Sequence, residues 1–391
     1  MTIPNEHLPR VQNRKKVFFF LYSLNGGGAE RIMLSVLQHM DHARFEGHLL
    51  LCECSGDYAH LVPPGIPVHD LQSVRSRRFN RFHVLWALLR IFKDNRPQLI
   101  ISTSKNTGLL ALLACVFLVI PARAVMRLTN MLTEKAKEDG FDASEWASHR
   151  WLYFFADMVI APSQAVLNDF QRSLDLRNPL RHRVILNFVD EGHIQACLQE
   201  TPVDLVRAPG TKRVILMSGR LMPRKRYELA LEAFRLLTVE DQDVSLWILG
   251  HGPSLEQLKK LAMDLGISHK VFFPGFQKNP YAFLQKADVF LMTSLFEGCP
   301  NVVLEAVYLG KPVVTTKYND SVSDLVEHGV NGYVIEPDPK ALALGLKAIL
   351  FDAQMSKKMS EASLEKGRCL TRKNGVAAYE KIFDDLLEHR L

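Results

Sequence analysis

Short apolar runs alternate with amphipathic stretches along most of the chain. Lys16–Tyr22 is a continuous apolar run, typical of a strand buried on both faces of a parallel sheet. A glycine-rich turn follows it, and the next stretch predicts a helix over Ala29–Met40. The alternation continues with predicted strands at 47–54, 66–71, 98–102, 122–128, 157–161 and 183–186. This order predicts an open parallel α/β sheet.

A second alternation begins at residue 213, after a polar stretch without strong periodicity. The pattern divides the chain into a disordered tail (1–13), a first domain (14–190), a linker (191–212), a second domain (213–370) and a C-terminal helix (371–391). We therefore predict two Rossmann-like, doubly wound domains that face each other across a cleft. Ligands of such sheets bind beyond the carboxyl ends of the strands, so the cleft is the expected site.

The composition narrows the class of protein. A chain of 391 residues is long enough for two cores, and 47% hydrophobic with 23% charged residues is typical of a globular protein. The net charge of +6 favours an anionic partner. The cysteines are scattered without a CxxC pair, and the longest apolar run, 109–120, is too short to span a bilayer. These features favour a cytoplasmic protein.

The stretch Ser294–Ala306 carries the most specific chemistry. It follows a predicted strand, turns at Gly298 and opens a helix at Pro300. The first amides of that helix have no intrahelical acceptor and lie at the positive end of its dipole, so they favour a phosphate. Glu297 and Glu305 flank this place, and carboxylates accept hydrogen bonds from hydroxyls. A phosphate between hydroxyl-rich rings indicates a sugar nucleotide, whereas a helix cap beside a solvated glutamate is the alternative.

A basic loop follows the first predicted strand of the second domain. Arg220, Arg224, Lys225 and Arg226 come directly after Gly219. A guanidinium grips two phosphate oxygens and an ammonium acts as a point charge, so the loop predicts neutralisation of a diphosphate. The alternative is an ordinary solvated loop.

Glycine-rich turns follow other predicted strands. We expect the backbone of Gly27 and Gly28 to approach a bound substrate and Arg31 to meet a phosphate, unless this turn is merely structural. It is not a dinucleotide-binding G-x-G-x-x-G turn, because Arg31 stands where that pattern needs a third glycine. Gly250 and Gly252 allow a similar close approach.

An aromatic residue, Phe276, follows the strand predicted at 271–273. Its ring faces either a nucleobase or the core, and the pattern leaves both open.

Together these motifs resemble a known family. Residues 213–336 contain SGRLMPRKR, ILGHGP, FPGF, SLFEGCPNVVLEAVYLGKPVV and GVNGYVIEP. These segments are similar to the nucleotide-binding half of retaining glycosyltransferases of family 4, which have the GT-B fold. NGGGAER and ILNFVD resemble parts of the acceptor-binding half. The resemblance also implies that the last helix packs back on the first domain.

The resemblance implies roles for individual residues. Glu297 is expected to contact the donor sugar and Glu305 the ribose hydroxyls. The diphosphate is expected to bind Arg220, Lys225 and the backbone amides around Asn301 and Val302.

One departure from the family concerns the acceptor side. Many relatives have a histidine in the loop after the fourth strand, but Ser102–Asn106 contains none. The residues that we consider as replacements for its polar contact are Lys105, Asn106, Arg127 and Asn130, and Arg31 is also expected on the acceptor side.

The sequence predicts neither a metal nor a resident cofactor. Asp241-Gln242-Asp243 has the spacing of a metal-binding Asp-x-Asp loop, but it precedes a predicted strand and so lies away from the ligand edge. We interpret it as a solvated turn. Arg220, Lys225 and the helix N-terminus supply positive charge for the leaving diphosphate instead.

A basic segment suggests where the acceptor comes from. Arg75, Arg77, Arg78 and Arg81 precede an apolar stretch, a combination that suits an anionic membrane surface. An ordinary amphipathic helix packed on the sheet is the alternative. We predict peripheral contact with the inner face of a bacterial membrane and a lipid-linked or glycan acceptor.

The leading hypothesis is therefore a glycosyltransferase that uses a nucleoside-diphosphate sugar, with UDP favoured by family frequency alone. A sugar-nucleotide epimerase of the same architecture and a non-catalytic sugar-nucleotide-binding protein are the alternatives. Nucleic-acid binding is disfavoured because the basic clusters lack interleaved stacking aromatics on an open sheet.

Overall fold

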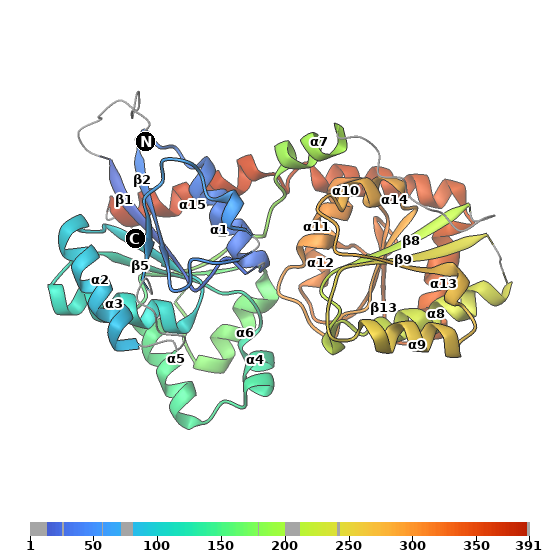
Figure 1. Cartoon of the computed structure of the whole chain (residues 1–391), viewed down its shortest axis with the longest axis horizontal. Coiled ribbons are helices and arrows are strands. Elements are labelled where there is room, and N and C mark those ends of the chain that lie inside the picture. Colours follow the sequence, from blue (N-terminus) through green and yellow to red (C-terminus); the bar gives the residue numbers. More distant parts are fainter. Residues whose placement is uncertain are drawn as a thin grey trace.

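The computed structural model describes residues 14–25, 27–56, 58–71, 81–178, 180–199, 212–240 and 243–388. Its strands form two parallel sheets of seven and six strands, each flanked by helices (Figure 1). The expected tail 1–13 lies outside the described residues, as do Arg75, Arg77, Arg78, Asp241 and Gln242.

The first sheet has the strand order β3-β2-β1-β4-β5-β6-β7, and all its pairs are parallel. Its strands are β1 (Lys15–Leu21), β2 (Phe45–Leu51), β3 (Val68–Asp70), β4 (Leu99–Ser102), β5 (Arg123–Arg127), β6 (Met158–Ala161) and β7 (His182–Val184). The order reverses between β1 and β4, which places the expected ligand position at their carboxyl ends.

Helices cover both faces of this sheet. They are α1 (Gly28–His39), η1 (Ala59–Leu61), α2 (Arg81–Asn95), α3 (Lys105–Leu118), α4 (Leu132–Asp139), α5 (Ala143–Phe155) and α6 (Gln164–Leu174). Phe19 of β1 packs in the cluster that includes α1, whereas Phe18 packs in the cluster with α2 and α3. The apolar run of β1 is continuous because both of its sides are buried.

The second sheet has the order β10-β9-β8-β11-β12-β13 and is also parallel. Its strands are β8 (Arg213–Ser218), β9 (Val244–Leu249), β10 (Val271–Gly275), β11 (Val289–Met292), β12 (Val313–Thr316) and β13 (Gly332–Ile335). Its helices are η2 (Pro223–Lys225), α8 (Tyr227–Glu240), α9 (Leu255–Asp264), η3 (Ser268–Lys270), α10 (Tyr281–Lys286), α11 (Asn301–Tyr308), α12 (Val322–Leu325), α13 (Pro339–Leu350) and α14 (Ala353–Gly367).

Two helices connect the sheets. α7 (Glu191–Gln199) lies in the stretch predicted as an irregular linker, and it buries Ile194 and Cys197 against the second sheet. With so few buried positions, its periodicity is too weak to read from the sequence. α15 (Arg372–Leu387) returns to the first sheet, where Tyr379 and Phe383 join the core cluster of β1 and α1 (Figure 1).

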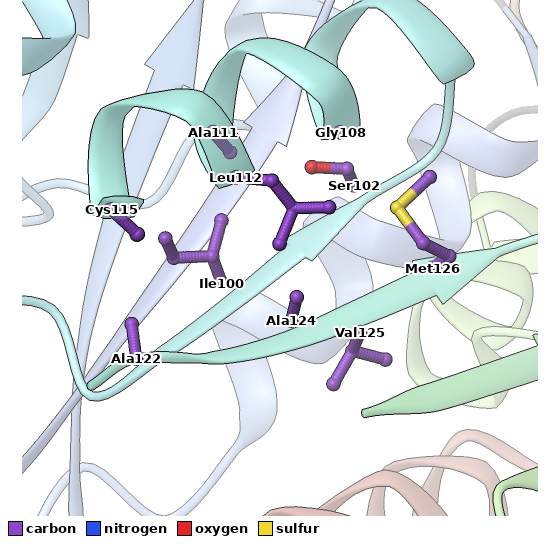
Figure 2. A pocket seen from close by; sticks show the side chains of 10 residues that line it. All are labelled: Ile100, Ser102, Gly108, Ala111, Leu112, Cys115, Ala122, Ala124, Val125 and Met126. Carbon is purple, nitrogen blue, oxygen red and sulfur yellow. The ribbon is translucent and has the colours of Figure 1, made fainter. Parts of the chain in front are cut away.

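A small cavity lies between α3 and strands β4 and β5. Apolar residues such as Ile100, Leu112 and Met126 line most of it, together with Ser102 (Figure 2). Its volume of about 10 Å³ corresponds to one water molecule at most, so it is no substrate site. No helix in the described part of the chain is long and apolar enough to cross a bilayer.

Candidate active site

The turn between β11 and α11 forms the centre of the candidate site. β11 is fully buried, and Pro300 occupies the N-cap position, so that Asn301 is the first residue of α11. Proline suits a helix start because its missing N–H is not needed there. No side chain among the described residues caps α11, and its first amides have no intrahelical acceptor.

Glu297 lies just before α11 and accepts hydrogen bonds from two donors. The Lys225 ammonium forms an ion pair with its carboxylate, and the Ser294 hydroxyl donates to the same oxygen over 2.7 Å. The side chains of Lys225 and Glu297 are only 16% and 13% exposed. Burial, reinforced by the Glu297 charge, raises the pKa of the Tyr227 phenol, so Tyr227 stays neutral near this pair.

Glu305 lies about one turn inside α11 and has one partner on a helix of each domain. Its carboxylate forms an ion pair with Arg31 of α1, and the Tyr281 hydroxyl donates to the same oxygen over 3.3 Å. The Glu305 side chain is 5% exposed and that of Arg31 is 31% exposed. Burial disfavours the charged guanidinium, but the charge and hydrogen bond of Glu305, together with Tyr281 and Tyr58, outweigh burial and raise the pKa of Arg31 above its ordinary value. Glu305 is thus a buried carboxylate whose counter-ion comes from the first domain.

The basic loop is fixed against the turn before α11. The Thr293 hydroxyl donates to the carbonyl oxygen of Lys225 over 2.9 Å, and the Leu295 amide donates to that of Arg224 over 2.8 Å. These backbone anchors place the Lys225 side chain beside Glu297. Arg220, at the start of the loop, is exposed to solvent.

Gly250 and Gly252 shape the turn after β9. A Cβ at Gly250 would lie 2.0 Å from the Gly219 carbonyl oxygen, and one at Gly252 would lie 2.2 Å from that of Leu221. Close packing against the basic loop therefore requires both glycines, a reason that the sequence pattern did not reveal. Phe276 is 64% exposed after β10, so its ring does not lie in the core.

The two domains meet at the N-terminus of α11. The Asn301 side-chain Nδ2 donates to the Gly28 carbonyl oxygen over 3.4 Å, and a Cβ at Gly28 would lie 2.8 Å from the same nitrogen. A Cβ at Gly298 would lie 2.3 Å from the Thr129 carbonyl oxygen and 3.1 Å from Asn130 Oδ1. Side chains at these two glycines would push the domains apart.

A buried chain of hydrogen bonds also leads to this point. Arg127, at the end of β5, is 2% exposed and donates to the Tyr379 hydroxyl over 2.8 Å and to Asn187 Oδ1 over 2.5 Å. Asn187 donates in turn to Asn301 Oδ1 over 2.7 Å and to the Cys299 carbonyl oxygen over 3.0 Å. These hydrogen bonds join β5, α15 and the start of α11.

Comparison with known families decides the class of protein. The Glycosyl transferase 4-like domain matches residues 27–187, and the family Glycosyl transferases group 1 matches residues 204–366. The chain belongs to the group 1 (family 4) glycosyltransferases. The first match contains strands β2 to β7 of the first sheet, and the second match contains all the strands of the second sheet.

Individual relatives agree with this assignment. The transferase is 26% identical to the Campylobacter jejuni N-acetylgalactosamine-N,N'-diacetylbacillosaminyl-diphospho-undecaprenol 4-alpha-N-acetylgalactosaminyltransferase. This alignment spans 351 residues and covers 88% of this chain and 92% of that protein. It is 34% identical over 199 residues to the lipopolysaccharide core biosynthesis glycosyltransferase LpsE of Rhizobium meliloti, covering 50% of this chain and 55% of that one. The structure of Anabaena HepE in complex with UDP-glucose has a TM-score of 0.76 at 20% identity, over 95% of this chain and 99% of that chain. This likeness shows the shared GT-B fold.

The residues predicted on the acceptor side of the transferase lie in different environments. Lys105 forms an ion pair with Glu145 of α5, so its charge is already compensated within the first domain. Arg127 is buried and donates to Tyr379 and Asn187, and its role toward an acceptor stays a prediction. Asn106 is half-buried in the first turn of α3, and Asn130 lies beside the turn before α11.

Several residues of the site were missed from the sequence. Tyr281 and Ser294 donate to the two glutamates, and Asn319 donates to the Glu297 carbonyl oxygen over 2.8 Å. Tyr281 and Asn319 lie on other elements, so only the fold brings them to the glutamates. Asn187 lies in the ILNFVD motif, where the family resemblance was the available signal. Among the described residues, no cluster of three or more His, Cys, Asp or Glu side chains is arranged to hold a metal.

Proposed function

We propose that this transferase moves a sugar, with retention of configuration, from a nucleoside-diphosphate sugar to a lipid-linked or glycan acceptor. The observation that carries the proposal is the pairing of Glu297 with Lys225 and of Glu305 with Arg31 on either side of the α11 N-terminus. Two carboxylates that can accept hydrogen bonds from hydroxyls, and two cations that can bind phosphate, therefore lie near the uncapped N-terminus of one helix.

Donor binding exchanges these ion pairs for contacts with the substrate. The diphosphate takes up Lys225, Arg220 and the first amides of α11, at Asn301 and Val302. Glu297, released from Lys225, accepts a hydrogen bond from a sugar hydroxyl, and Glu305 accepts from the ribose. The glycine-rich and aromatic positions that complete the donor site in this proposal are Gly27, Gly28, Gly250, Gly252, Phe276, Gly298 and Pro300.

The chemical step needs a stabilised leaving group. The bond from the sugar's anomeric carbon to the phosphate oxygen breaks, and an acceptor hydroxyl oxygen bonds to that carbon on the same face. The hydroxyl proton passes to the departing phosphate oxygen. Arg220, Lys225 and the helix N-terminus stabilise the charge on the diphosphate, so the proposal requires no metal, and no carboxylate is assigned as a nucleophile.

The relatives and the domain arrangement support the proposed partners. UDP is the proposed nucleotide, supported by the UDP complexes of HepE. A lipid-linked acceptor in bacterial polysaccharide, lipopolysaccharide or glycolipid synthesis is supported by the names of the relatives from C. jejuni and R. meliloti. We assign acceptor binding to residues 14–190 and donor binding to residues 213–370. The transferase would act at the inner membrane face, with Arg75, Arg77, Arg78 and Arg81 near anionic lipid.

A donor panel tests the proposal. Purified protein is incubated with UDP-, GDP- and dTDP-sugars and bacterial lipid extract, with and without EDTA, and the products are identified by mass spectrometry. We expect one donor to yield a glycosylated lipid and free nucleoside diphosphate, with EDTA making no difference. Glu305→Gln should weaken binding of that donor. Glu256→Gln is the matched control, because Glu256 is 82% exposed and forms a surface pair with Lys259.

The other functions give different products. A new sugar nucleotide formed without acceptor would indicate an epimerase, and donor binding without turnover would indicate a binding protein. If no nucleotide sugar is bound or consumed, the proposed function is wrong.

A further inference from the structure

Three neighbouring helices of the first domain expose large apolar side chains. α2 contacts α3, and α3 contacts α5, on the side of the first sheet opposite α1 and α15 (Figure 1). Among the described large apolar residues that are exposed in 14–190, all but Val68 and Leu180 belong to these helices or to Val119 directly after α3. We call this outer side the helix-layer surface; it comprises Phe82, Trp86, Val116, Phe117, Val119, Trp151, Phe154 and Phe155.

The pattern of α2 shows how the surface is oriented. Val84, Leu88 and Phe92 are fully buried against the sheet. Phe82 and Trp86, 85% and 55% exposed, lie on the opposite side of the helix. The sequence left open whether this helix packs on the sheet or meets a membrane, and the structure shows that its two sides differ.

α3 is apolar on all sides. From Leu109 to Val119 its sequence contains no charged or amide side chain, yet Val116 and Phe117 are 69% and 65% exposed. A helix at the surface of a soluble domain normally has a polar outer face. The outer side of α3 therefore suits an environment less polar than water.

α5 adds a cluster of aromatic rings. The Phe155 ring lies 4.9 Å from that of Trp151 and 5.3 Å from that of Phe154, measured between centroids. All three rings are exposed by at least 43%. α5 lies close to α3, because Lys105 pairs with Glu145 and a Cβ at Gly108 would lie 3.4 Å from Leu152.

The charges on the same surface are mainly positive. Arg90, Lys93 and Arg150 are exposed among the apolar residues, against Asp94, and the Arg150 guanidinium also donates to the Leu174 carbonyl oxygen over 2.8 Å. The Arg90 guanidinium lies 4.8 Å above the Trp86 ring, a pairing of apolar ring and cation that suits the boundary between lipid tails and headgroups.

We propose that the helix-layer surface docks on an anionic lipid bilayer. The exposed rings of α2, α3 and α5 enter the headgroup–acyl boundary, while Arg90, Lys93 and Arg150 meet lipid phosphates. The inference rests on the proposed function in one respect, namely that the acceptor is lipid-linked. Each of these helices begins at the carboxyl edge of the sheet, so docking brings the candidate active site alongside the bilayer.

Vesicle flotation without donor or acceptor tests the docking separately from the transfer reaction. Vesicles of phosphatidylglycerol and phosphatidylethanolamine are compared with vesicles of phosphatidylcholine. We expect the wild type to bind the anionic vesicles and Phe117→Ser/Phe154→Ser/Phe155→Ser to lose at least tenfold in binding. Leu344→Ser is the matched control, because Leu344 is 67% exposed on α13 of the second domain, and it should bind as the wild type does.

A charge variant and a fold control complete the test. Arg90→Gln/Lys93→Gln should weaken binding and reduce its dependence on salt. Unchanged UDP binding by the aromatic variant shows that it is folded. The docking proposal is overturned if the wild type does not bind anionic vesicles or if the aromatic variant binds them equally well. It is also overturned if this surface instead holds two copies together, so that the aromatic variant only dissociates a dimer.

Discussion

Replacing Arg31 by methionine removes the counter-ion of Glu305 while keeping a side chain of similar length. In the structure, the Arg31 guanidinium forms an ion pair with the Glu305 carboxylate, which is the group proposed to bind the ribose. Donor binding must therefore displace it. Arg31→Met leaves Tyr281 as the remaining donor to Glu305 and makes the carboxylate available to a nucleoside.

The burial of the two side chains sets the size of the effect. Breaking a fully buried pair costs about 3–5 kcal/mol, but exposed pairs contribute about 0–1 kcal/mol. Glu305 is 5% and Arg31 31% exposed. We therefore assign an intermediate value of about 1–2 kcal/mol to the Arg31–Glu305 pair. This energy corresponds to roughly a 5–30-fold change in the equilibrium constant for nucleoside binding.

Calorimetric titration with uridine and with UDP separates the two roles of Arg31. Uridine, which has no phosphate, should bind Arg31→Met more tightly than it binds the wild type, because Glu305 is released. The ratio of UDP affinity to uridine affinity should fall in Arg31→Met, because a cation proposed to bind phosphate is missing. Arg368→Met is the control, since Arg368 is 75% exposed in a surface pair. If uridine and UDP both weaken by the same factor, Arg31 only orients Glu305 and the exchange of partners is wrong.

Further predictions concern turnover, thiols and pH. Arg220→Ala should lower kcat by at least tenfold with less change in donor affinity, because exposed Arg220 is proposed to act on the leaving diphosphate; a loss confined to affinity would contradict this role. In a thiol-labelling assay at pH 8, exposed Cys54 and Cys369 should react quickly, whereas burial raises the pKa of Cys52 to about 12 and should keep it unlabelled until the protein unfolds. Burial lowers the pKa of His48, His149 and His182, so the unfolded chain binds more protons as pH falls below about 6.5. The free energy of unfolding, measured with urea, should therefore fall from pH 7.5 to pH 5, and a flat profile would show that these rings are protonated in the folded state.

Much of the fold could be predicted because the signals are local. Buried parallel strands such as β4 are continuous apolar runs bounded by turns, and β4 (Leu99–Ser102) lies within the strand predicted at 98–102. α4 was missed between two predicted elements, because Leu132 is its only buried residue and the helix therefore lacks an apolar stripe. α7 was missed for the same reason.

The second domain's part of the site is also encoded locally. Glu297 and Glu305 lie on one short segment, and the basic loop needs only a strand end and a glycine to be recognised. The first domain's part depends on contacts between distant residues. Neither the burial of Arg127 under Tyr379 nor the pairing of Lys105 with Glu145 can be read from residues in their own neighbourhoods.

The two carboxylates therefore respond differently to a separation of the domains. The Lys225–Glu297 pair lies wholly in the second domain and would survive such a movement, whereas Arg31 would be withdrawn from Glu305. A buried carboxylate without a counter-ion is costly, so the ion pair favours the closed arrangement as long as no donor is bound. Under the proposed function, ribose hydroxyls would replace Arg31 as the hydrogen-bond partners of Glu305. Donor binding would then remove one of the contacts that hold the domains together and would free a cation of the first domain to meet the diphosphate.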